Sequence, residues 1–175
     1  MDKGSIHIYC GEGKGKTTAA IGQGIREASQ GRSVIIIQFM KEKNAEEIGF
    51  VQRLEPEIKL FRFQKSEESF EQLNEAEKTE EIQNLKNGLN FARKVLVTEE
   101  CDVLILDEVL GLIETHVIEA EDLYALFDAK HEGTSLILTG IYPAKELWDR
   151  VDEVTEMITV YRKVESESEK SIDNA

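Results

Sequence analysis

The chain has 175 residues, 41% of them hydrophobic, and its 35 acidic and 21 basic side chains give a formal net charge of −14. That length suits one compact domain with a core of its own. The excess of negative charge repels nucleic-acid backbones and anionic membrane surfaces, so we expect no nucleic acid and no membrane as a partner.

The N-terminal part of the sequence predicts a βαβ unit. Residues 6–10 predict a short strand, a glycine-rich turn covers 11–15, and a helical pattern runs from Lys16 to about Gln30, with Gly31 as its stop. The β-branched run 34–39 is typical of a strand buried on both faces of a parallel sheet. Strand, loop, helix and strand in this order predict a right-handed crossover.

Periodicity is weaker in the middle of the chain. Residues 46–55 predict a short helix and residues 58–63 a strand. From about Ser69 to Glu99 the sequence is acidic, with apolar residues at steps of three and four, which indicates an amphipathic helix with a solvated acidic face. Those apolar residues are Ile82, Leu85, Leu89, Ala92 and Leu96.

The last third of the sequence predicts alternating strands and helices. Two buried strands are expected at 103–108 and 135–140, separated by a helix at 119–130. Pro143 suits the first turn of a further helix that continues through Leu147 and Trp148. Residues 154–161 alternate loosely and predict a last strand at the edge of the sheet.

These elements predict an α/β protein with a P-loop NTPase-like (RecA-like) three-layer fold, in which helices flank a mainly parallel central sheet. No repeat or linker interrupts the pattern, so we expect a single domain over residues 1–164. The polar stretch 165–175 predicts a disordered tail.

Cysteine usage and hydropathy predict a reduced, cytoplasmic setting. Cys10 and Cys101 form neither a CxxC pair nor a zinc-type spacing with the three scattered histidines. No apolar run approaches the roughly 20 residues that span a bilayer. The N-terminus runs into the first strand pattern without the apolar core of a signal peptide.

The strongest chemical signal is the glycine-rich turn before the first helix, Gly11-Glu12-Gly13-Lys14-Gly15-Lys16-Thr17-Thr18. Closely spaced glycines let backbone amides converge on an anion, and the helix adds the positive end of its dipole. Lys16 can reach phosphate oxygens, and the Thr17 hydroxyl can ligate Mg²⁺, or Mn²⁺ in its place. The usual GxxxxGK[ST] pattern has a glycine where this chain has Cys10, so the loop is a compact variant. The sequence predicts that this loop binds the triphosphate of ATP.

Two further segments end predicted strands with polar residues. Asp107 and Glu108 follow a buried strand, where a carboxylate of a P-loop protein approaches Mg²⁺ or orients its water shell; a helix N-cap or a solvated loop is the alternative. Thr139 and Gly140 end the next strand, at the edge where open α/β sheets bind ligands, and a plain strand-to-helix turn is the alternative there.

Four other residues have an open interpretation. Lys14 is either a second cation for phosphate or a loop lysine that faces solvent. Glu12 opposes phosphate binding unless its carboxylate points away from the loop. Phe61 and Phe63 lie on one face of their predicted strand, where core packing is the default and a ligand contact is the alternative.

Five segments, in order along the chain, resemble the motifs of one known family. The loop from Gly11 to Ala20 comes first, and four shorter segments follow it. They are Gln38-Phe39-Met40-Lys41 (QF-x-K), Leu106-Asp107-Glu108 (LDE), Leu138-Thr139-Gly140 (LTG) and Val154-Thr155-Glu156-Met157 (VTEM). The family that they resemble is that of the ATP:corrinoid adenosyltransferases, the P-loop class of cob(I)alamin adenosyltransferase.

The resemblance implies an enzyme that transfers the 5′-deoxyadenosyl group of MgATP to the Co(I) centre of a reduced corrinoid and releases tripolyphosphate. In that family the cobalt itself attacks the ribose C5′, so the protein needs no nucleophilic side chain. The loop from Gly11 to Thr18 would hold the triphosphate in reversed polarity, and Thr17 and Glu108 would hold Mg²⁺. Lys16, Thr17 and Glu108 are then the expected catalytic residues. The family also implies a homodimer and a reductant protein as a partner.

The chain departs from that family's pattern at several positions. Glu12 stands where relatives have an amide or a short acid, and Ile141 stands where they have an arginine. The family carries a Phe-x-Trp element near the corrinoid, and Phe61-Arg62-Phe63 is the segment of this chain that resembles it, with Phe63 in place of the tryptophan. Two other readings stay open: a small-molecule P-loop kinase, which would release ADP, and a nucleotide-binding carrier or regulator without adenosyl transfer.

Overall fold

The computed structural model describes residues 3–40, 50–66 and 68–163. Its centre is one sheet of six parallel strands in the order β3-β2-β4-β5-β1-β6. The strands are β1 (Ile6–Cys10), β2 (Val34–Gln38), β3 (Ile58–Arg62), β4 (Val103–Asp107), β5 (Ser135–Thr139) and β6 (Glu153–Glu156). The predicted α/β class and parallel sheet are confirmed.

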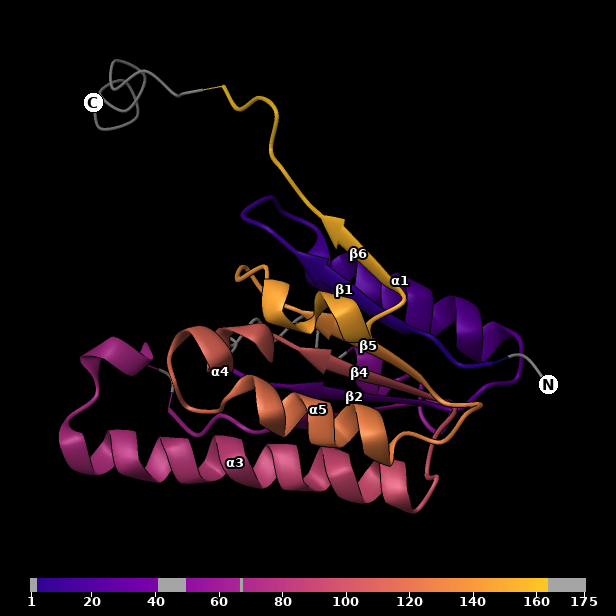
Figure 1. Cartoon of the computed structure of the whole chain (residues 1–175), viewed down its shortest axis with the longest axis horizontal. Helices are drawn as coiled ribbons and strands as arrows, with labels where there is room; N and C mark the ends of the chain where they lie inside the picture. The colour runs from indigo at the N-terminus through magenta and orange to yellow at the C-terminus, as the bar shows by residue number, and fades with distance from the viewer. Residues whose placement is uncertain (1–2, 41–49, 67, 164–175) are drawn as a thin grey trace, which may run out of the picture.

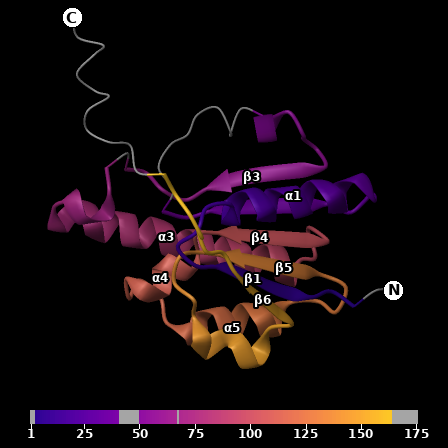
Figure 2. The same cartoon turned by 90° about the horizontal axis from the view of Figure 1, so that it is seen from above.

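Helices cover both faces of this sheet, which gives the three predicted layers (Figures 1 and 2). Helix α1 (Lys16–Ser29) packs on one face, where Ala20 joins a core with Val34, Ile36 and Ile105. The opposite face carries α3 (Glu75–Val97), α4 (Leu110–Glu114), α5 (Ala120–Ala129) and the 3₁₀ helix η2 (Lys145–Arg150). Strands β2 and β4 are buried along their whole length because they lie between these two layers.

The long acidic helix begins later than the sequence predicts. A 3₁₀ helix, η1 (Phe70–Gln72), comes first, and α3 starts at Glu75. Asn74 caps it: its side chain accepts from the Glu77 N–H at 3.0 Å, and the Glu77 carboxylate accepts from the Asn74 N–H at 2.9 Å. This capping box satisfies the amides of the first turn and fixes the boundary. The predicted apolar stripe is confirmed, with Leu85 and Leu96 buried against the sheet.

Two boundaries in the C-terminal part of the chain were predicted wrongly. Pro143 is not in the first turn of a helix, because Ala144 adopts a left-handed conformation (φ 49°) and the 3₁₀ helix η2 begins after it. The last strand ends at Glu156 rather than near Tyr161. Its partner β1 ends at Cys10, the residue paired with Glu156, so β6 has no further residue of β1 to pair with.

One helix was not predicted, and some predictions cannot be compared. Helix α4 (Leu110–Glu114) is five residues long, too short for a periodic signal. The predicted helix 46–55 lies partly outside the described residues, which are helical at 50–52, and the predicted tail 165–175 lies wholly outside them. In the part of the chain that the structure describes, no helix is long and apolar enough to cross a membrane.

A candidate nucleotide and metal site at the carboxyl edge of the sheet

The glycine-rich loop connects β1 to α1 and is held by the chain that follows β5 and β6. The Gly11 N–H donates to the Ile141 carbonyl at 3.1 Å, and the Gly13 N–H donates to the Met157 carbonyl at 2.8 Å. A Cβ atom at Gly13 would lie 2.6 Å from that carbonyl group, so a side chain does not fit there. Gly15 has φ 108°, a conformation that favours glycine. These contacts shape the loop before any ligand binds.

Lys16 begins α1 and points back over the loop. Its side chain is buried, with 8% of its surface exposed, and its Nζ donates to the Gly13 carbonyl at 2.7 Å. The first amides of α1 have no partner within the helix, as at every helix N-terminus, and they add a positive dipole end. Lys14, Glu12 and Thr18 are exposed. The loop therefore places one buried ammonium group and a helix N-terminus together, an arrangement that binds phosphate.

Asp107 is the centre of a hydrogen-bond network next to this loop. The residue ends β4 and is 1% exposed. Its Oδ1 accepts from the hydroxyls of Thr17 at 2.8 Å and Thr139 at 2.7 Å, and its Oδ2 accepts from Gln38 Nε2 at 3.0 Å. Glu108 follows in a left-handed conformation (φ 63°), and its N–H donates to Thr139 Oγ1 at 2.9 Å. Of the residues predicted for the site, this network brings Thr17, Asp107 and Thr139 together.

The donors around Thr17 fit Mg²⁺. A hydroxyl and a carboxylate are hard oxygen ligands, which this ion prefers. Among residues 3–40, 50–66 and 68–163, no group of three or more His, Cys, Asp or Glu side chains could hold a metal ion. Mg²⁺ at a nucleotide site does not need such a cage, because phosphate oxygens and water complete its octahedron. Asp107 contacts Thr17 directly, whereas the role of Glu108 as a magnesium ligand stays a prediction.

A model of one protein family matches residues 2–173 of the chain, and its description is ATP:corrinoid adenosyltransferase BtuR/CobO/CobP. The chain belongs to this family. The predicted resemblance to the corrinoid adenosyltransferases is therefore confirmed.

Relatives that are named corrinoid adenosyltransferase align with most of the chain. It is 27% identical over 163 residues to corrinoid adenosyltransferase CobA of Salmonella typhimurium, covering 89% of this chain and 77% of that protein. It is 25% identical over 162 residues to the corrinoid adenosyltransferase of Escherichia coli strain K12, with the same coverage. Among solved structures, a KaiC-like protein from Pyrococcus horikoshii matches with a TM-score of 0.53 at 20% identity. That match covers 83% of this chain and 64% of the other, and it shows the P-loop fold alone.

Three residues predicted for this adenosyltransferase site have other contacts in the structure. Gly140 packs against α4, where a Cβ atom would lie 2.6 Å from Leu110 Cβ. Phe61 and Phe63 lie at β3, four places from β1 in the sheet, and their rings meet Phe91 of α3 at centroid distances of 4.8 and 5.7 Å. The structure does not bring these aromatic rings to the loop.

Two residues that connect to Asp107 were not predicted as site residues. Gln38 ends the buried strand β2 and is 5% exposed, yet its side chain bonds to Asp107. Arg62 ends β3, and its Nε donates to the Gln38 Oε1 at 3.0 Å. A polar residue that closes an otherwise apolar strand was the available signal for Gln38. Nothing in the sequence pairs it with Arg62.

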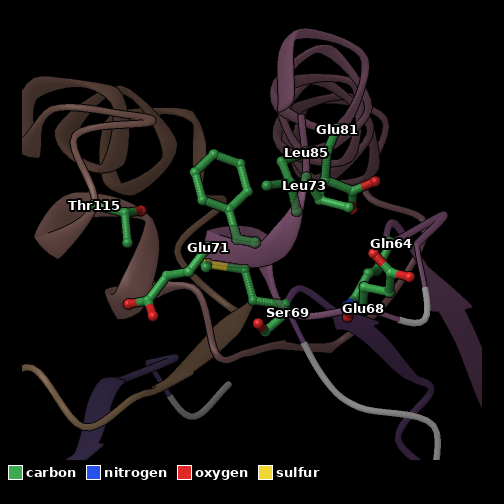
Figure 3. A pocket seen from close by; sticks show the side chains of 10 residues that line it. Gln64, Glu68, Ser69, Glu71, Leu73, Glu81, Leu85 and Thr115 are labelled. Carbon is green, nitrogen blue, oxygen red and sulfur yellow. The ribbon is translucent and has the colours of Figure 1, made fainter. Parts of the chain in front are cut away.

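Two cavities lie at the same edge of the adenosyltransferase fold. One of about 250 Å³ is shown in Figure 3, where Glu71 and Thr115 lie on one side and Gln64 and Glu68 on the other. It is lined by Met40, Gln64, Glu68, Ser69, Phe70, Glu71, Leu73, Glu81, Leu85 and Thr115. Among the described residues, the buried Gln64 Oε1 has no hydrogen-bond partner. The other cavity, of about 640 Å³, borders the loop at Gly11 and Glu12 and includes the exposed Ile141.

Proposed function

We propose that the chain binds MgATP on the loop from Gly11 to Thr18 and transfers the 5′-deoxyadenosyl group to the Co(I) centre of a reduced corrinoid. The observation that carries the proposal is the contact of Thr17 Oγ1 with Asp107 Oδ1 at 2.8 Å, in a chain of the ATP:corrinoid adenosyltransferase family. This contact joins the first turn of α1, directly after the glycine-rich loop, to a buried carboxylate at the end of β4. Such a pair is what Mg²⁺ needs in order to bind next to a triphosphate.

The loop and helix α1 bind the leaving group. Lys16 exchanges its bond to the Gly13 carbonyl for phosphate oxygens, since an ammonium group gains more from an anion than from a neutral acceptor. The N-terminus of α1 supplies further donors. Thr17 and Asp107 hold Mg²⁺, with Glu108 as a further ligand or as an acceptor for its water. When bound, Mg²⁺ neutralises charge on the triphosphate.

The proposed chemistry requires little of the protein beyond positioning and electrostatics. The Co(I) electron pair attacks the ribose C5′ and forms the Co–C bond, and the C5′–O5′ bond breaks. Its electron pair leaves on the oxygen of tripolyphosphate, and the cobalt becomes formally Co(III). Lys16 and the α1 N-terminus stabilise the negative charge that grows on the departing oxygen. Since the substrate is the nucleophile, no catalytic serine or cysteine is needed.

The corrinoid is proposed to approach the same edge of the sheet on the side of β3. The cavity of about 250 Å³ in Figure 3 offers an apolar wall that includes Met40, Leu73 and Leu85. The buried Gln64 Oε1 is an acceptor for a donor group of the substrate. Phe61 lies in β3 and Phe63 directly follows that strand, next to Gln64 of this cavity, so their rings act indirectly in corrinoid binding and do not contact ATP.

An anaerobic assay with MgATP and chemically reduced cob(I)alamin tests the proposal. We expect the corrinoid spectrum to convert to that of the adenosylated form, with tripolyphosphate as the phosphate product. ADP as the product would point to a kinase. Tight MgATP binding without conversion would refute adenosyl transfer and favour a carrier or regulator. A Lys16→Ala variant controls for uncatalysed reaction of the reduced corrinoid.

A further inference from the structure

Three side chains form a continuous row across the carboxyl ends of three neighbouring strands. Gln38 of β2 is in register with Arg62 of β3 on one side and with Asp107 of β4 on the other. Arg62 Nε donates to Gln38 Oε1 at 3.0 Å, and Gln38 Nε2 donates to Asp107 Oδ2 at 3.0 Å. The row therefore connects an edge strand to the carboxylate that meets Thr17.

The chemistry of the row allows only one orientation of the Gln38 amide. The guanidinium of Arg62 can only donate, so the amide oxygen must face it. The carboxylate of Asp107 accepts, so the amide NH₂ must face that side. Reversal of the amide would oppose two donors at one end and two acceptors at the other. Gln38 is 5% exposed, so bulk water cannot readily replace either bond.

This orientation fixes the carboxylate of Asp107. Gln38 holds Oδ2, which leaves Oδ1 directed at the hydroxyls of Thr17 and Thr139. Without the Gln38 bond, Oδ2 loses a donor while Oδ1 keeps its bonds to Thr17 and Thr139, so the plane of the carboxylate is less restrained about the Cβ–Cγ bond. Partners that orient a metal ligand in this way commonly change metal affinity 10–100-fold when they are removed, an order of magnitude taken from other sites.

We infer that Gln38 and Arg62 are positioning residues, which set the affinity of the site for Mg²⁺ with ATP through the orientation of Asp107. The inference rests on the proposed function, because it assumes that Asp107 faces the metal. Arg62 also lies between Phe61 and Phe63, whose rings pack on Phe91 of α3. A shift of β3 against α3 would therefore reach the metal site through two hydrogen bonds.

The test compares ATP affinity with saturating Mg²⁺ and with excess EDTA, by isothermal titration of the full chain. Gln38→Leu keeps the volume but loses both bonds, and we expect about a 10–100-fold loss of affinity with Mg²⁺ and less than about a twofold loss without it. Arg62→Met should give a smaller loss that is also confined to Mg²⁺, and Arg62→Lys should recover part of it. Lys59→Met is the matched control, since it removes an exposed positive charge from the same strand.

The Gln38→Leu/Arg62→Met double variant should lose no more affinity than Gln38→Leu alone, because both residues act through one row. Equal losses with and without Mg²⁺, or a loss in Lys59→Met as large as in Arg62→Met, would overturn the inference. If Gln38→Leu does not fold, as judged by circular dichroism, the three Arg62 and Lys59 variants decide alone. Asp107→Ala separates the two proposals. If Asp107→Ala loses the Mg²⁺ dependence of ATP binding and Gln38→Leu has the same dependence as the parent protein, only the positioning inference fails. If Asp107→Ala also keeps the Mg²⁺ dependence of ATP binding, Asp107 is not a metal ligand, and the positioning inference fails as well.

Discussion

Asp107→Asn tests whether the carboxylate has a structural role, a metal-binding role, or both. The buried oxygens accept hydrogen bonds from Thr17, Thr139 and Gln38. Asparagine has one oxygen, so it cannot accept on both sides. With its oxygen toward the threonines, its NH₂ meets the NH₂ of Gln38. In the reverse orientation, the hydroxyl hydrogen of the fully buried Thr139 loses its acceptor.

Either orientation leaves a buried donor unsatisfied, which costs about 1–3 kcal/mol of unfolding free energy. For a domain of this size, that corresponds to a fall in Tm of roughly 2–12 °C. The double variant Asp107→Asn/Gln38→Glu should recover most of this loss, because the new carboxylate at 38 accepts from the Asn NH₂ and from Arg62. It should not recover the Mg²⁺ dependence of ATP binding, since the charge now lies one strand away from Thr17.

Urea unfolding followed by circular dichroism measures the first effect, and titration with ATP in Mg²⁺ or EDTA measures the second. Gln38→Glu alone is the control, and it should be the least stable variant because two carboxylates then face each other at the site of the 3.0 Å bond. An Asp107→Asn protein as stable as the parent would refute the hydrogen-bond reasoning. Recovery of the Mg²⁺ dependence in the double variant would show that the charge at 107 does not ligate the metal.

Three further predictions concern the loop, the packing of α3 and the thiols. Lys16→Ala should weaken ATP binding about 10- to 100-fold, the loss of a charged hydrogen bond, and an equal loss in the exposed control Lys86→Ala would contradict this. Gly88→Ala should lower the unfolding free energy by about 1–2 kcal/mol, because a Cβ atom there would lie 2.7 Å from ring atoms of the α3–sheet interface and the steric cost exceeds the gain in helix propensity. A Cβ atom at Gly22 in α1 has no neighbour within 4 Å, so Gly22→Ala should stabilise the protein. If urea unfolding gives changes of the same sign for Gly88→Ala and Gly22→Ala, the packing argument for Gly88 is wrong. Burial raises the pKa of the Cys101 thiol to about 12, which leaves almost no thiolate at pH 8; we expect labelling by a thiol reagent only after unfolding, and rapid labelling of the native protein would show that the site opens.

The local parts of the fold were predictable, and the long-range contacts of the site were not. The strand before the loop, helix α1 and the stop at Gly31 follow from short patterns, and the structure places them within a residue or two of the prediction. The loop composition also singled out Lys16 and Thr17, whose roles in ATP binding stay a prediction. The choice of Asp107 over Glu108 as the partner of Thr17 depends on the backbone after β4, where Glu108 turns left-handed. No spacing in the sequence encodes that turn.

The same distinction explains the errors. The helix expected from Ser69 starts at Glu75 because a capping box competes with the acidic pattern. The strand expected to run to Tyr161 stops with β1, its only neighbour among the described strands, and a sequence pattern does not show where a neighbour ends. Gln38 was recognised as part of a family segment but was given no role, because its contacts are to Arg62 and Asp107, which are 24 and 69 positions away.

The hydrogen bonds that hold the glycine-rich loop have a consequence for biosynthesis. The loop sequence leaves the ribosome early, but the carbonyls that hold Gly11 and Gly13 belong to Ile141 and Met157. Both neighbours of β1, the strands β5 and β6, are also synthesised last. A nascent chain therefore contains every residue of the glycine-rich loop long before it can give the loop its shape. Incomplete chains should be unable to compete with the finished protein for cellular ATP.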